Sequence, residues 1–125
     1  MSLYPLGTTS VDELLQITQA LVPEIAHDFD VARNVNGVEL RPLGIDKGTG
    51  SQRVAELLDV PLTAMAGVGD SDPDLTYLRR VAFSGAPANA TPAVRQFVNY
   101  VAKASFGAGL LEIVMLVERQ NRSFL

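Results

Sequence analysis

A short apolar run that ends in an acidic turn constrains this chain more than any other feature. Residues 64–68 read Ala-Met-Ala-Gly-Val, and residues 69–74 continue as Gly-Asp-Ser-Asp-Pro-Asp. A run this short, bounded by turn residues, is typical of a buried strand rather than a helix. Open parallel sheets bind their ligands at the carboxyl ends of their strands. The pattern therefore predicts an α/β fold with acidic groups at its ligand-binding edge.

The acidic turn itself has two interpretations. The carboxylates of Asp70, Asp72 and Asp74 lie within five residues, and they repel one another unless a cation is present. Oxygen ligands of this kind suit Mg²⁺. The turn can instead begin the next helix, because Asp72 is a favourable N-cap residue and Pro73 suits the first helical turn. An isolated Lys-Gly pair at 47–48, upstream of the strand, favours the binding site over the plain turn.

Composition excludes several classes of function. The chain has 125 residues, a formal net charge of −4 and no cysteine. The acidic balance argues against nucleic acid or an anionic membrane surface as a partner. The lack of cysteine excludes disulfides and thiolate catalysis, and His27 is the only histidine, so a His-based triad is not expected. No apolar run approaches the ~18 residues that a membrane span needs, and we expect a cytoplasmic location.

Residues 1–45 begin with a predicted helix. Ser10 and Glu13 have the spacing of a capping box, which marks the first turn of a helix. Apolar residues then recur at helical spacing through residues 11–25, so one face of the helix is expected to be buried. Pro23 is expected to kink this helix or to end it early, because proline lacks the N–H that the helix needs.

A β-hairpin is predicted after this helix. Strand-like runs at residues 29–35 and 38–45 flank Asn36 and Gly37. Asn-Gly is the strongest two-residue hairpin signal, because both positions of the turn require a positive φ that these residues tolerate. The first 45 residues therefore predict a small α+β unit.

From Lys47 onward, helices and strands alternate. Such alternation predicts a parallel sheet with right-handed crossovers. The last predicted helix has Arg119 and Arg122 near its end, where positive charge favours the helix dipole. The expected helices cover residues 51–58, 73–80, 91–98 and 110–117, and the expected strands cover residues 64–68, 81–84 and 100–102.

The order of these motifs resembles a known superfamily. The Lys-Gly pair at 47–48, a helix and then residues 69–74 resemble the third and fourth motifs of the haloacid dehalogenase superfamily, in which a Gly-Asp is followed by a second Asp four positions after the first. The resemblance spans residues 37–114 and is strongest to the Cof-type and sugar-phosphatase branch, although many relatives carry Asn where this chain has Pro73. Similar segments surround the two motifs at residues 41–48, 84–90 and 107–112.

The first motif of that superfamily, an Asp-x-Asp pair whose first Asp is the nucleophile, has no convincing match. Asp28-Phe29-Asp30 is the only candidate by spelling before Lys47, and it lies at a polar boundary instead of after a buried strand. The chain thus resembles the C-terminal part of such a protein. The resemblance implies that residues 1–45 are a cap remnant and that residues 46–125 are the C-terminal half of a Rossmann-like α/β core.

The resemblance also implies a function and a set of roles. It implies a Mg²⁺-dependent phosphatase that hydrolyses a small phosphomonoester, with a sugar phosphate as the expected class, through an aspartyl-phosphate. Lys47 would be the catalytic residue of this chain and would bind phosphate. Asp70 and Asp74 would bind Mg²⁺, and Ser71 and Asn89 would contact the phosphate.

The chain alone is expected to be inactive, because the nucleophile is missing. The expected ligand is a small phosphorylated metabolite. If no strand precedes the one at residues 64–68 in the sheet, its edge is open, which predicts a homodimer or pairing with the missing N-terminal portion of the same protein. An alternative function from a different class is a non-catalytic assembly or regulatory module with the same fold.

Overall fold

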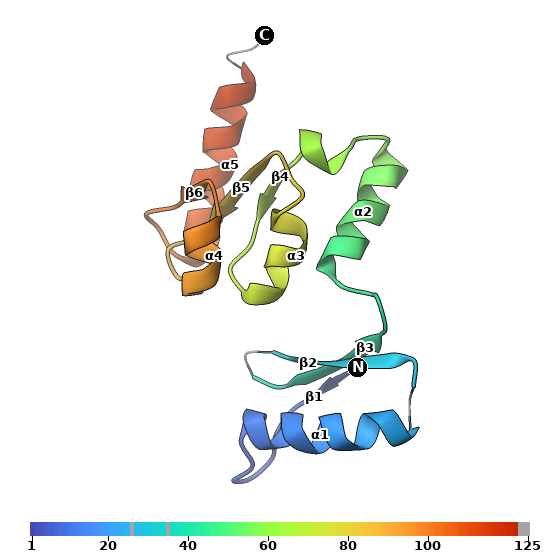
Figure 1. Cartoon of the computed structure of the whole chain (residues 1–125). Coiled ribbons are helices and arrows are strands. Elements are labelled where there is room, and N and C mark those ends of the chain that lie inside the picture. The colour runs from blue at the N-terminus through green and yellow to red at the C-terminus, as the bar shows by residue number, and fades with distance from the viewer. Residues whose placement is uncertain (26, 35, 123–125) are drawn as a thin grey trace. The chain divides into compact units, whose positions relative to one another are not determined.

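Two separate sheets organise the chain (Figure 1). This computed structural model describes residues 1–25, 27–34 and 36–122; for residue 25 it describes only the backbone. The chain divides into two units, Met1–Ile45 and Asp46–Leu125. Among the described residues, no helix combines the length and the apolar composition that a membrane crossing requires.

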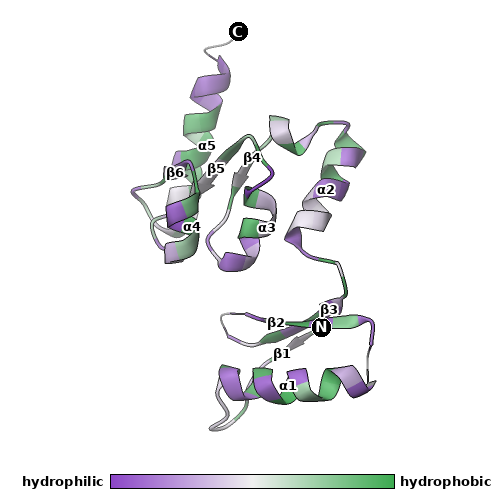
Figure 2. Ribbon diagram, in the orientation of Figure 1, coloured by the Kyte–Doolittle hydropathy of each residue, from purple (hydrophilic) through white to green (hydrophobic). Residues whose placement is uncertain are grey.

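The first unit is an antiparallel sheet with one helix. Its elements are β1 (Ser2–Leu3), α1 (Val11–Ile25), β2 (Phe29–Arg33) and β3 (Val38–Pro42), with the strands in the order β1-β3-β2. Hydrophobic and hydrophilic positions alternate along α1 (Figure 2). Val22 of α1, together with Val38 and Leu40 of β3, is buried. The predicted amphipathic helix followed by a hairpin is confirmed.

The two ends of α1 differ in how well the sequence predicted them. The capping box is confirmed: the Ser10 amide donates to Glu13 Oε2 (2.7 Å), and the Glu13 amide donates to Ser10 Oγ (3.1 Å). Of the two effects expected of Pro23, an early end of the helix was wrong, because α1 continues to Ile25 with Pro23 inside it, and a kink stays a prediction. Pro23 lies in the last turn, so few backbone bonds depend on it.

The hairpin turn is shifted from its predicted position. Arg33 pairs with Val38, and the Asn34 amide donates to the carbonyl of Gly37 (2.8 Å). Gly37 therefore faces Asn34 across the hairpin instead of standing at the centre of the turn. A Cβ at Gly37 would come within 2.3 Å of the Leu3 carbonyl oxygen, so this glycine is needed for close approach to β1. Residue 35, the predicted end of the first strand, lies outside the described residues.

The second unit contains a parallel sheet, as the alternation predicted. Its strands run in the order β4-β5-β6, with Gly67 opposite Ser84 and Gly85 opposite Tyr100. The α/β fold class is confirmed. The elements are α2 (Lys47–Leu58), η1 (Leu62–Ala64), β4 (Ala66–Val68), η2 (Asp72–Asp74), α3 (Leu75–Leu78), β5 (Phe83–Ala86), α4 (Pro92–Phe97), β6 (Tyr100–Val101) and α5 (Phe106–Arg122).

Several boundaries differ from the predicted ones. The strand expected at residues 64–68 begins at Ala66, because the preceding residues form the 3₁₀ turn η1, which buries Leu62. The strand expected at 81–84 is displaced to Phe83–Ala86. The last helix begins at Phe106 and is longer than expected at both ends. These are boundary errors, and the type and order of every expected element in this unit are confirmed.

Small residues in β5 bring α5 close to the sheet. Ser84, Gly85 and Ala86 are all buried, and a Cβ at Gly85 would come within 2.8 Å of Ile113 Cγ2. Ile113 itself is fully buried. Because α5 lies against the strand at van der Waals distance, its first turn is held at the same edge of the sheet as the end of β4.

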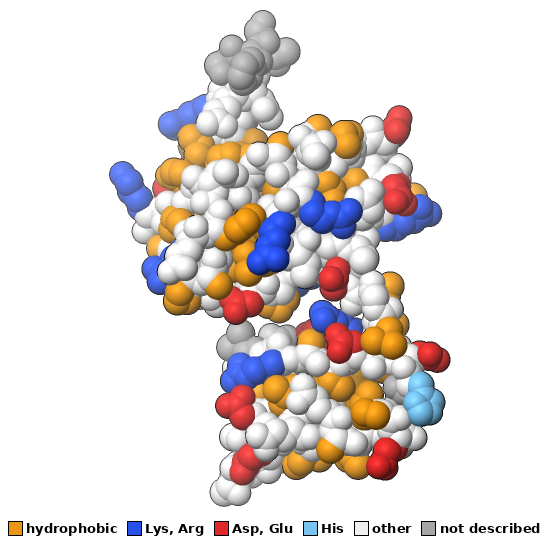
Figure 3. Space-filling view, in the orientation of Figure 1, with side chains coloured by type: hydrophobic (Ala, Val, Ile, Leu, Met, Phe, Trp, Pro, Cys, Tyr) orange, Lys and Arg blue, Asp and Glu red, His pale blue; other side chains and the backbone are white. Residues whose placement is uncertain are grey.

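Charged side chains do not gather in one patch on the face of the molecule that Figure 3 shows. On the face shown in Figure 3, basic and acidic groups are scattered over each unit. One acidic group has a clear structural use: Glu112 of α5 accepts the Tyr100 hydroxyl (2.6 Å) and the amides of Lys103 (3.1 Å) and Ala104 (3.2 Å). These bonds attach the segment between β6 and α5 to the helix.

Acidification should weaken this attachment. The hydrogen bond from Tyr100, and then that from the Lys103 amide, lower the pKa of Glu112 from its ordinary value of 4.5. A carboxylate with a lowered folded pKa contributes stability above its unfolded pKa and loses that contribution as the pH falls through the folded pKa. Glu112→Gln should therefore be less stable at neutral pH and lose less stability than wild type from about pH 5 to about pH 3.

Thermal unfolding at a series of pH values measures this difference. Glu118→Gln is the matched control, because Glu118 lies on the same helix in an exposed pair with Arg122 and such pairs contribute little. Identical pH profiles for Glu112→Gln and wild type would contradict the assigned role of Glu112.

Candidate active site

Asp74 is the centre of the acidic turn. It is only 3% exposed. Its Oδ2 atom accepts the backbone amides of Asp70 and Ser71 (both 2.9 Å) and the Ser71 hydroxyl (3.0 Å). Its Oδ1 atom accepts the Lys47 ammonium. The two motifs that the sequence singled out are therefore joined by a direct ion pair at the carboxyl end of β4.

The Lys-Gly pair has a physical explanation. Lys47 is the first residue of α2, whose N-cap is Asp46. A Cβ at Gly48 would come within 2.8 Å of the Thr76 carbonyl oxygen, so glycine lets the start of α2 approach α3 closely. This approach places Lys47 beside Asp74. The helix expected to begin at residue 51 begins at Lys47, because Asp46 caps it; the spacing of Asp46 to Thr49 is a capping signal that is visible in the sequence.

The Gly-Asp pair has a similar explanation. A Cβ at Gly69 would lie 2.5 Å from the Cβ of Asp74 and 2.9 Å from its Cγ. Only glycine at this position lets the Asp74 side chain fold back over the end of the strand. The spacing of the motif thus follows from one short turn, at the end of which the Asp74 side chain bonds to the amides of Asp70 and Ser71 at its beginning.

Hydrogen bonding keeps Asp74 ionised. Burial by itself raises the pKa of Asp74, but the hydrogen bond from Lys47 and those from Ser71 and Asp70 outweigh burial, so its pKa is lowered from the ordinary 3.8. Tyr77 shows the opposite effect. Burial, and then the charges of Asp74 and Asp70, raise the pKa of Tyr77 to about 12. Its hydroxyl therefore remains protonated and donates to the carbonyl of Val68.

A cavity of about 510 Å³ opens beside these groups. Its polar lining includes Lys47, Asp70 and Asp74, and its apolar lining includes Phe106 and Leu110 from the start of α5. The side chain of Lys47 remains 57% exposed, in spite of its pair with Asp74. The volume lies in the range of small-molecule sites, so the cavity suits a small anionic ligand that Lys47 can reach.

The predicted phosphate contacts are only partly brought together. Ser71 lies at the site, but its amide and its hydroxyl both donate to Asp74. Asn89 Oδ1 accepts the Phe106 amide (2.6 Å) at the start of α5, and Asn89 is not among the residues that line the cavity. Neither arrangement tests phosphate binding, and both roles stay predictions.

Asp72 has a different role from the expected one. The N-cap of the turn η2 is Ser71, so the interpretation of Asp72 as the cap was wrong. Asp72 Oδ1 instead accepts the hydroxyl of Thr91 (2.6 Å). Thr91 also donates its amide to the carbonyl of Asp70 (2.9 Å). The sequence analysis missed Thr91 as a neighbour of the acidic turn, because the contact depends on tertiary packing.

The residues in hand fit a hard cation only in part. Within residues 1–25, 27–34 and 36–122, no group of three or more His, Cys, Asp and Glu side chains is placed to hold a metal ion. Asp70 is exposed at the cavity and can offer a carboxylate oxygen directly. Asp74 already binds partners through both oxygens, which suits an indirect role through water better than direct ligation.

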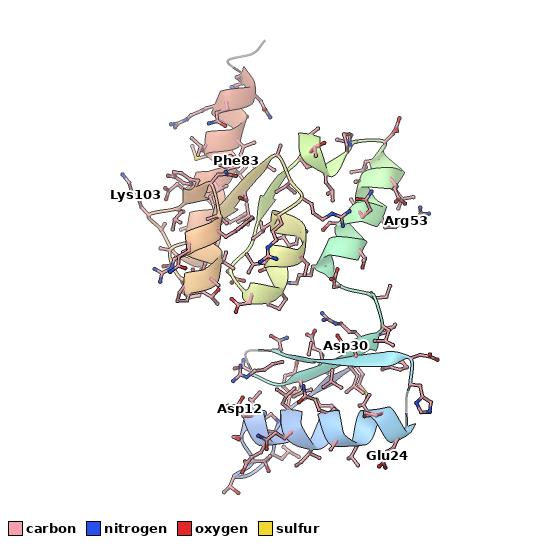
Figure 4. The ribbon with its side chains drawn as sticks, viewed as in Figure 1. Asp12, Glu24, Asp30, Arg53, Phe83 and Lys103 are labelled. Carbon is pink, nitrogen blue, oxygen red and sulfur yellow. The ribbon has the colours of Figure 1, made fainter. Side chains whose placement is uncertain are left out.

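The Asp-x-Asp spelling at residues 28–30 belongs to the first unit. Asp30 lies on β2, where Figure 4 labels it, and its Oδ2 pairs with Arg41 Nη2 at 3.0 Å. Asp30 is therefore a partner in a cross-strand ion pair of the antiparallel sheet. This placement gives it a structural explanation of its own.

Comparison with known protein families shows which family the chain belongs to. A family model described as haloacid dehalogenase-like hydrolase matches residues 6–114. The chain belongs to the haloacid dehalogenase-like hydrolases. The family resemblance inferred from residues 37–114 is confirmed, and the match extends further into the first unit.

Individual relatives agree with this assignment. The chain is similar to a phosphoglycolate phosphatase of Methanothrix thermoacetophila (38% identical over 77 residues, covering 62% of this chain and 35% of the relative). It is also similar to one of Natronomonas pharaonis (36% identical over 98 residues, covering 75% and 43%). The chain thus spans less than half the length of these curated relatives.

A solved structure supports the fold. A haloacid dehalogenase-like hydrolase from Bacteroides thetaiotaomicron superposes with a TM-score of 0.74 at 21% identity. The superposition covers 87% of this chain and 41% of that protein. At this identity the likeness establishes the fold alone, and it includes both units of the chain.

Asp74 should matter far more for stability than Asp70. Asp74→Asn places amide hydrogens against groups that already donate, so we expect a loss of about 2–4 kcal/mol in the free energy of unfolding. Asp70→Asn, its matched control four residues earlier on the exposed surface, should change stability by less than about 0.5 kcal/mol. Urea unfolding at neutral pH measures both. Similar losses in the two variants would contradict the central place of Asp74.

Proposed function

We propose that this chain carries the lysine and acidic motifs of a Mg²⁺-dependent phosphatase that acts on a small phosphomonoester. The observation that carries the proposal is the ion pair between Lys47 and Asp74 beside the exposed Asp70, at the carboxyl end of a parallel strand. Family membership supports hydrolase chemistry. The relatives named phosphoglycolate phosphatase make 2-phosphoglycolate the first substrate to test, with sugar phosphates as the second class.

Lys47 is the proposed phosphate-binding group. An ammonium has three donors, and its bond to Asp74 orients it while others remain for phosphate oxygens. The amides of Asp70 and Ser71 are directed at Asp74, so they are not free to bind an anion in this arrangement. Phosphate recognition by this part of the site therefore depends on the lysine. A positive side chain next to a transferring phosphoryl group stabilises the charge of the transition state.

The acidic side of the site is proposed to serve the metal. When bound, Mg²⁺ would screen the phosphate charge from nearby carboxylates. Asp70 would hold it directly, and Asp74 would act through the loop that it organises. The nucleophile that forms the aspartyl-phosphate is proposed to lie in polypeptide outside these 125 residues, since the Asp-x-Asp that precedes Lys47, at residues 28–30, lies at the antiparallel strand β2 instead of after a parallel strand.

The edge of β4 is the proposed contact for that missing portion. Among the described residues, β4 pairs with β5 alone. Beside β4, a groove of about 520 Å³ is lined by α2 and β4 and includes Val54, Leu62 and Met65. An edge strand leaves backbone N–H and C=O groups without strand partners, and parallel strands are normally buried on both faces. An additional apolar strand beside β4 would cover both the edge and the groove. We propose that the N-terminal portion of the same protein supplies it, and that two copies of the chain associate here when it is absent.

One observation favours the alternative of a non-catalytic assembly or regulatory module. Asp74 is already bound through both oxygens, and among the described residues no group of three or more His, Cys, Asp and Glu side chains is placed to hold a metal ion. A module of this kind would keep the ion pair for stability and would bind neither Mg²⁺ nor phosphate. Ligand binding separates the two functions.

We expect 2-phosphoglycolate with Mg²⁺ to bind the isolated chain without being hydrolysed. NMR titration of 2-phosphoglycolate at constant Mg²⁺ should move the amide resonances of residues 47 and 70, and the shifts caused by 2-phosphoglycolate should be lost in Lys47→Met. Arg53→Met is the matched control, because Arg53 is an exposed cation on the same helix. Shifts that persist in Lys47→Met, or none in wild type, would contradict the proposed function.

Phosphate release in the same samples tests the missing nucleophile. Without a covalent step, only positioning and charge stabilisation remain, so turnover should not exceed background. Hydrolysis at ordinary enzymatic rates that disappears in Asp30→Asn would show that the nucleophile lies within this chain, and the proposal of a missing portion would fall.

The open edge predicts self-association of the isolated chain. Light scattering at micromolar concentration should detect a dimer, because pairing would cover the open edge of β4 and the apolar groove beside it. Val54→Glu puts a charge in the groove and should shift the sample to monomer. Leu57→Glu is the control, since Leu57 lies on the same helix, is 70% exposed and does not line the groove. A monomeric wild-type chain would mean that the edge is not a contact surface between copies.

A further inference from the structure

The acidic loop between β4 and η2 is held at both ends by hydroxyl-bearing residues. At its start, the Tyr77 hydroxyl donates to the carbonyl of Val68. At its end, Thr91 donates its amide to the Asp70 carbonyl (2.9 Å) and its hydroxyl to Asp72 Oδ1 (2.6 Å). Tyr77 and Thr91 belong to neither the lysine motif nor the acidic motif. The phosphate-binding and metal-binding roles proposed above do not involve them.

The contact made by Tyr77 satisfies a backbone group that the sheet leaves unpaired. The Gly69 amide donates to the Gly85 carbonyl on β5 (3.2 Å). In a trans peptide the preceding carbonyl points the opposite way, so the Val68 carbonyl is directed away from β5. An unpaired carbonyl there would leave the start of the loop free to rotate. The Tyr77 hydroxyl prevents this.

The ring of Tyr77 is itself fixed in place. A Cβ at Gly67 would come within 3.1 Å of Tyr77 Cε2, so the ring lies against the backbone of β4, and a larger residue at position 67 would have to displace the ring by a few tenths of an ångström. Tyr77 is half-buried and lines the cavity as well as the groove beside β4. A glycine inside a three-residue strand, otherwise unfavourable, is thereby explained by the tyrosine that packs on it.

Thr91 connects the far end of the loop to a helix. It is the N-cap of α4, and its side chain accepts the Val94 amide (3.4 Å). The same residue therefore ends the turn after β5, begins α4 and bonds the acidic loop through its backbone and its side chain. Movement of Asp70 away from the sheet would break the amide contact first.

We propose that Tyr77 and Thr91 are positioning residues that hold the backbone of the acidic loop, so that the Asp70 amide stays on Asp74 while the Asp70 carboxylate faces the cavity. The consequence of this positioning, that Asp70 is presented to a cation, rests on the proposed function. The geometry of the loop stands without it. Neither residue contacts substrate in this scheme.

Amide hydrogen exchange of the free chain tests the positioning directly. In Tyr77→Phe we expect the Asp70 and Ser71 amides, which donate to Asp74, to exchange roughly tenfold faster, as expected for loss of about one hydrogen bond. The Ala102 amide, which donates to the Ala86 carbonyl between the other two strands (2.8 Å), should be unchanged. Tyr100→Phe is the matched control, since it removes a tyrosine hydroxyl bonded to Glu112 outside the loop.

Thr91 provides a second variant if Tyr77→Phe does not fold. Thr91→Val removes the hydroxyl and should also accelerate exchange at Asp70 and Ser71. Thr91→Ser keeps the hydroxyl and should restore the wild-type rates. The inference is overturned if the variants that fold change these two amides no more than Tyr100→Phe does, or if Ser fails to restore what Val removes.

Broadening of amide resonances by Mn²⁺ separates this inference from the proposed function. In wild type, Mn²⁺ should broaden Asp70 and its neighbours selectively, and Tyr77→Phe should need several-fold more Mn²⁺ for the same broadening. If wild type shows no selective broadening but the exchange rates are as expected, the proposed metal site is contradicted and the positioning role is still supported. Equal broadening in wild type and Tyr77→Phe would overturn the inference.

Discussion

The buried carboxylate of Asp74 is the interaction on which this site depends. A charge with so little exposure requires partners, and Asp74 obtains them from two directions: the ammonium of Lys47 at the start of α2, and the amides of the loop that follows β4. The same carboxylate thus sets the position of the cation and the conformation of the acidic turn. The remaining features of the site are arranged around it.

Much of this organisation was readable in the sequence. The apolar run and the acidic turn predicted the strand and the acidic groups at its carboxyl end, and the alternation of elements predicted the parallel sheet. The contacts of Asn89 and Asp72 were not predictable, because each depends on a partner brought near by tertiary packing. The contact of Ser71 with Asp74 is local, and its three-residue spacing is that of a capping box. The start of α2 was missed because Asp46 was not recognised as a cap, although its spacing to Thr49 is visible in the sequence.

Close approach explains why the motifs have glycines where they do. Gly48, Gly67 and Gly69 each leave room for a specific group: a carbonyl of α3, the ring of Tyr77 and the side chain of Asp74. Glycine is common in turns, so its presence in a sequence does not by itself indicate a close approach. The structure shows that Gly48 and Gly69 are required sterically, and that a side chain at position 67 would have to displace the ring of Tyr77.

The connection between β4 and β5 has a consequence for how this family can vary. Residues 69–82 are at once the crossover that joins two parallel strands and the segment that carries Asp70 and Asp74. A parallel crossover needs about a dozen residues or more. An insertion between Asp70 and Asp74 would separate the Asp74 carboxylate from the amides of Asp70 and Ser71 that it accepts, so length variation is restricted in this part of the crossover. The part of the crossover after Asp74 is not restricted in this way, because the spacing of the two carboxylates does not depend on its length.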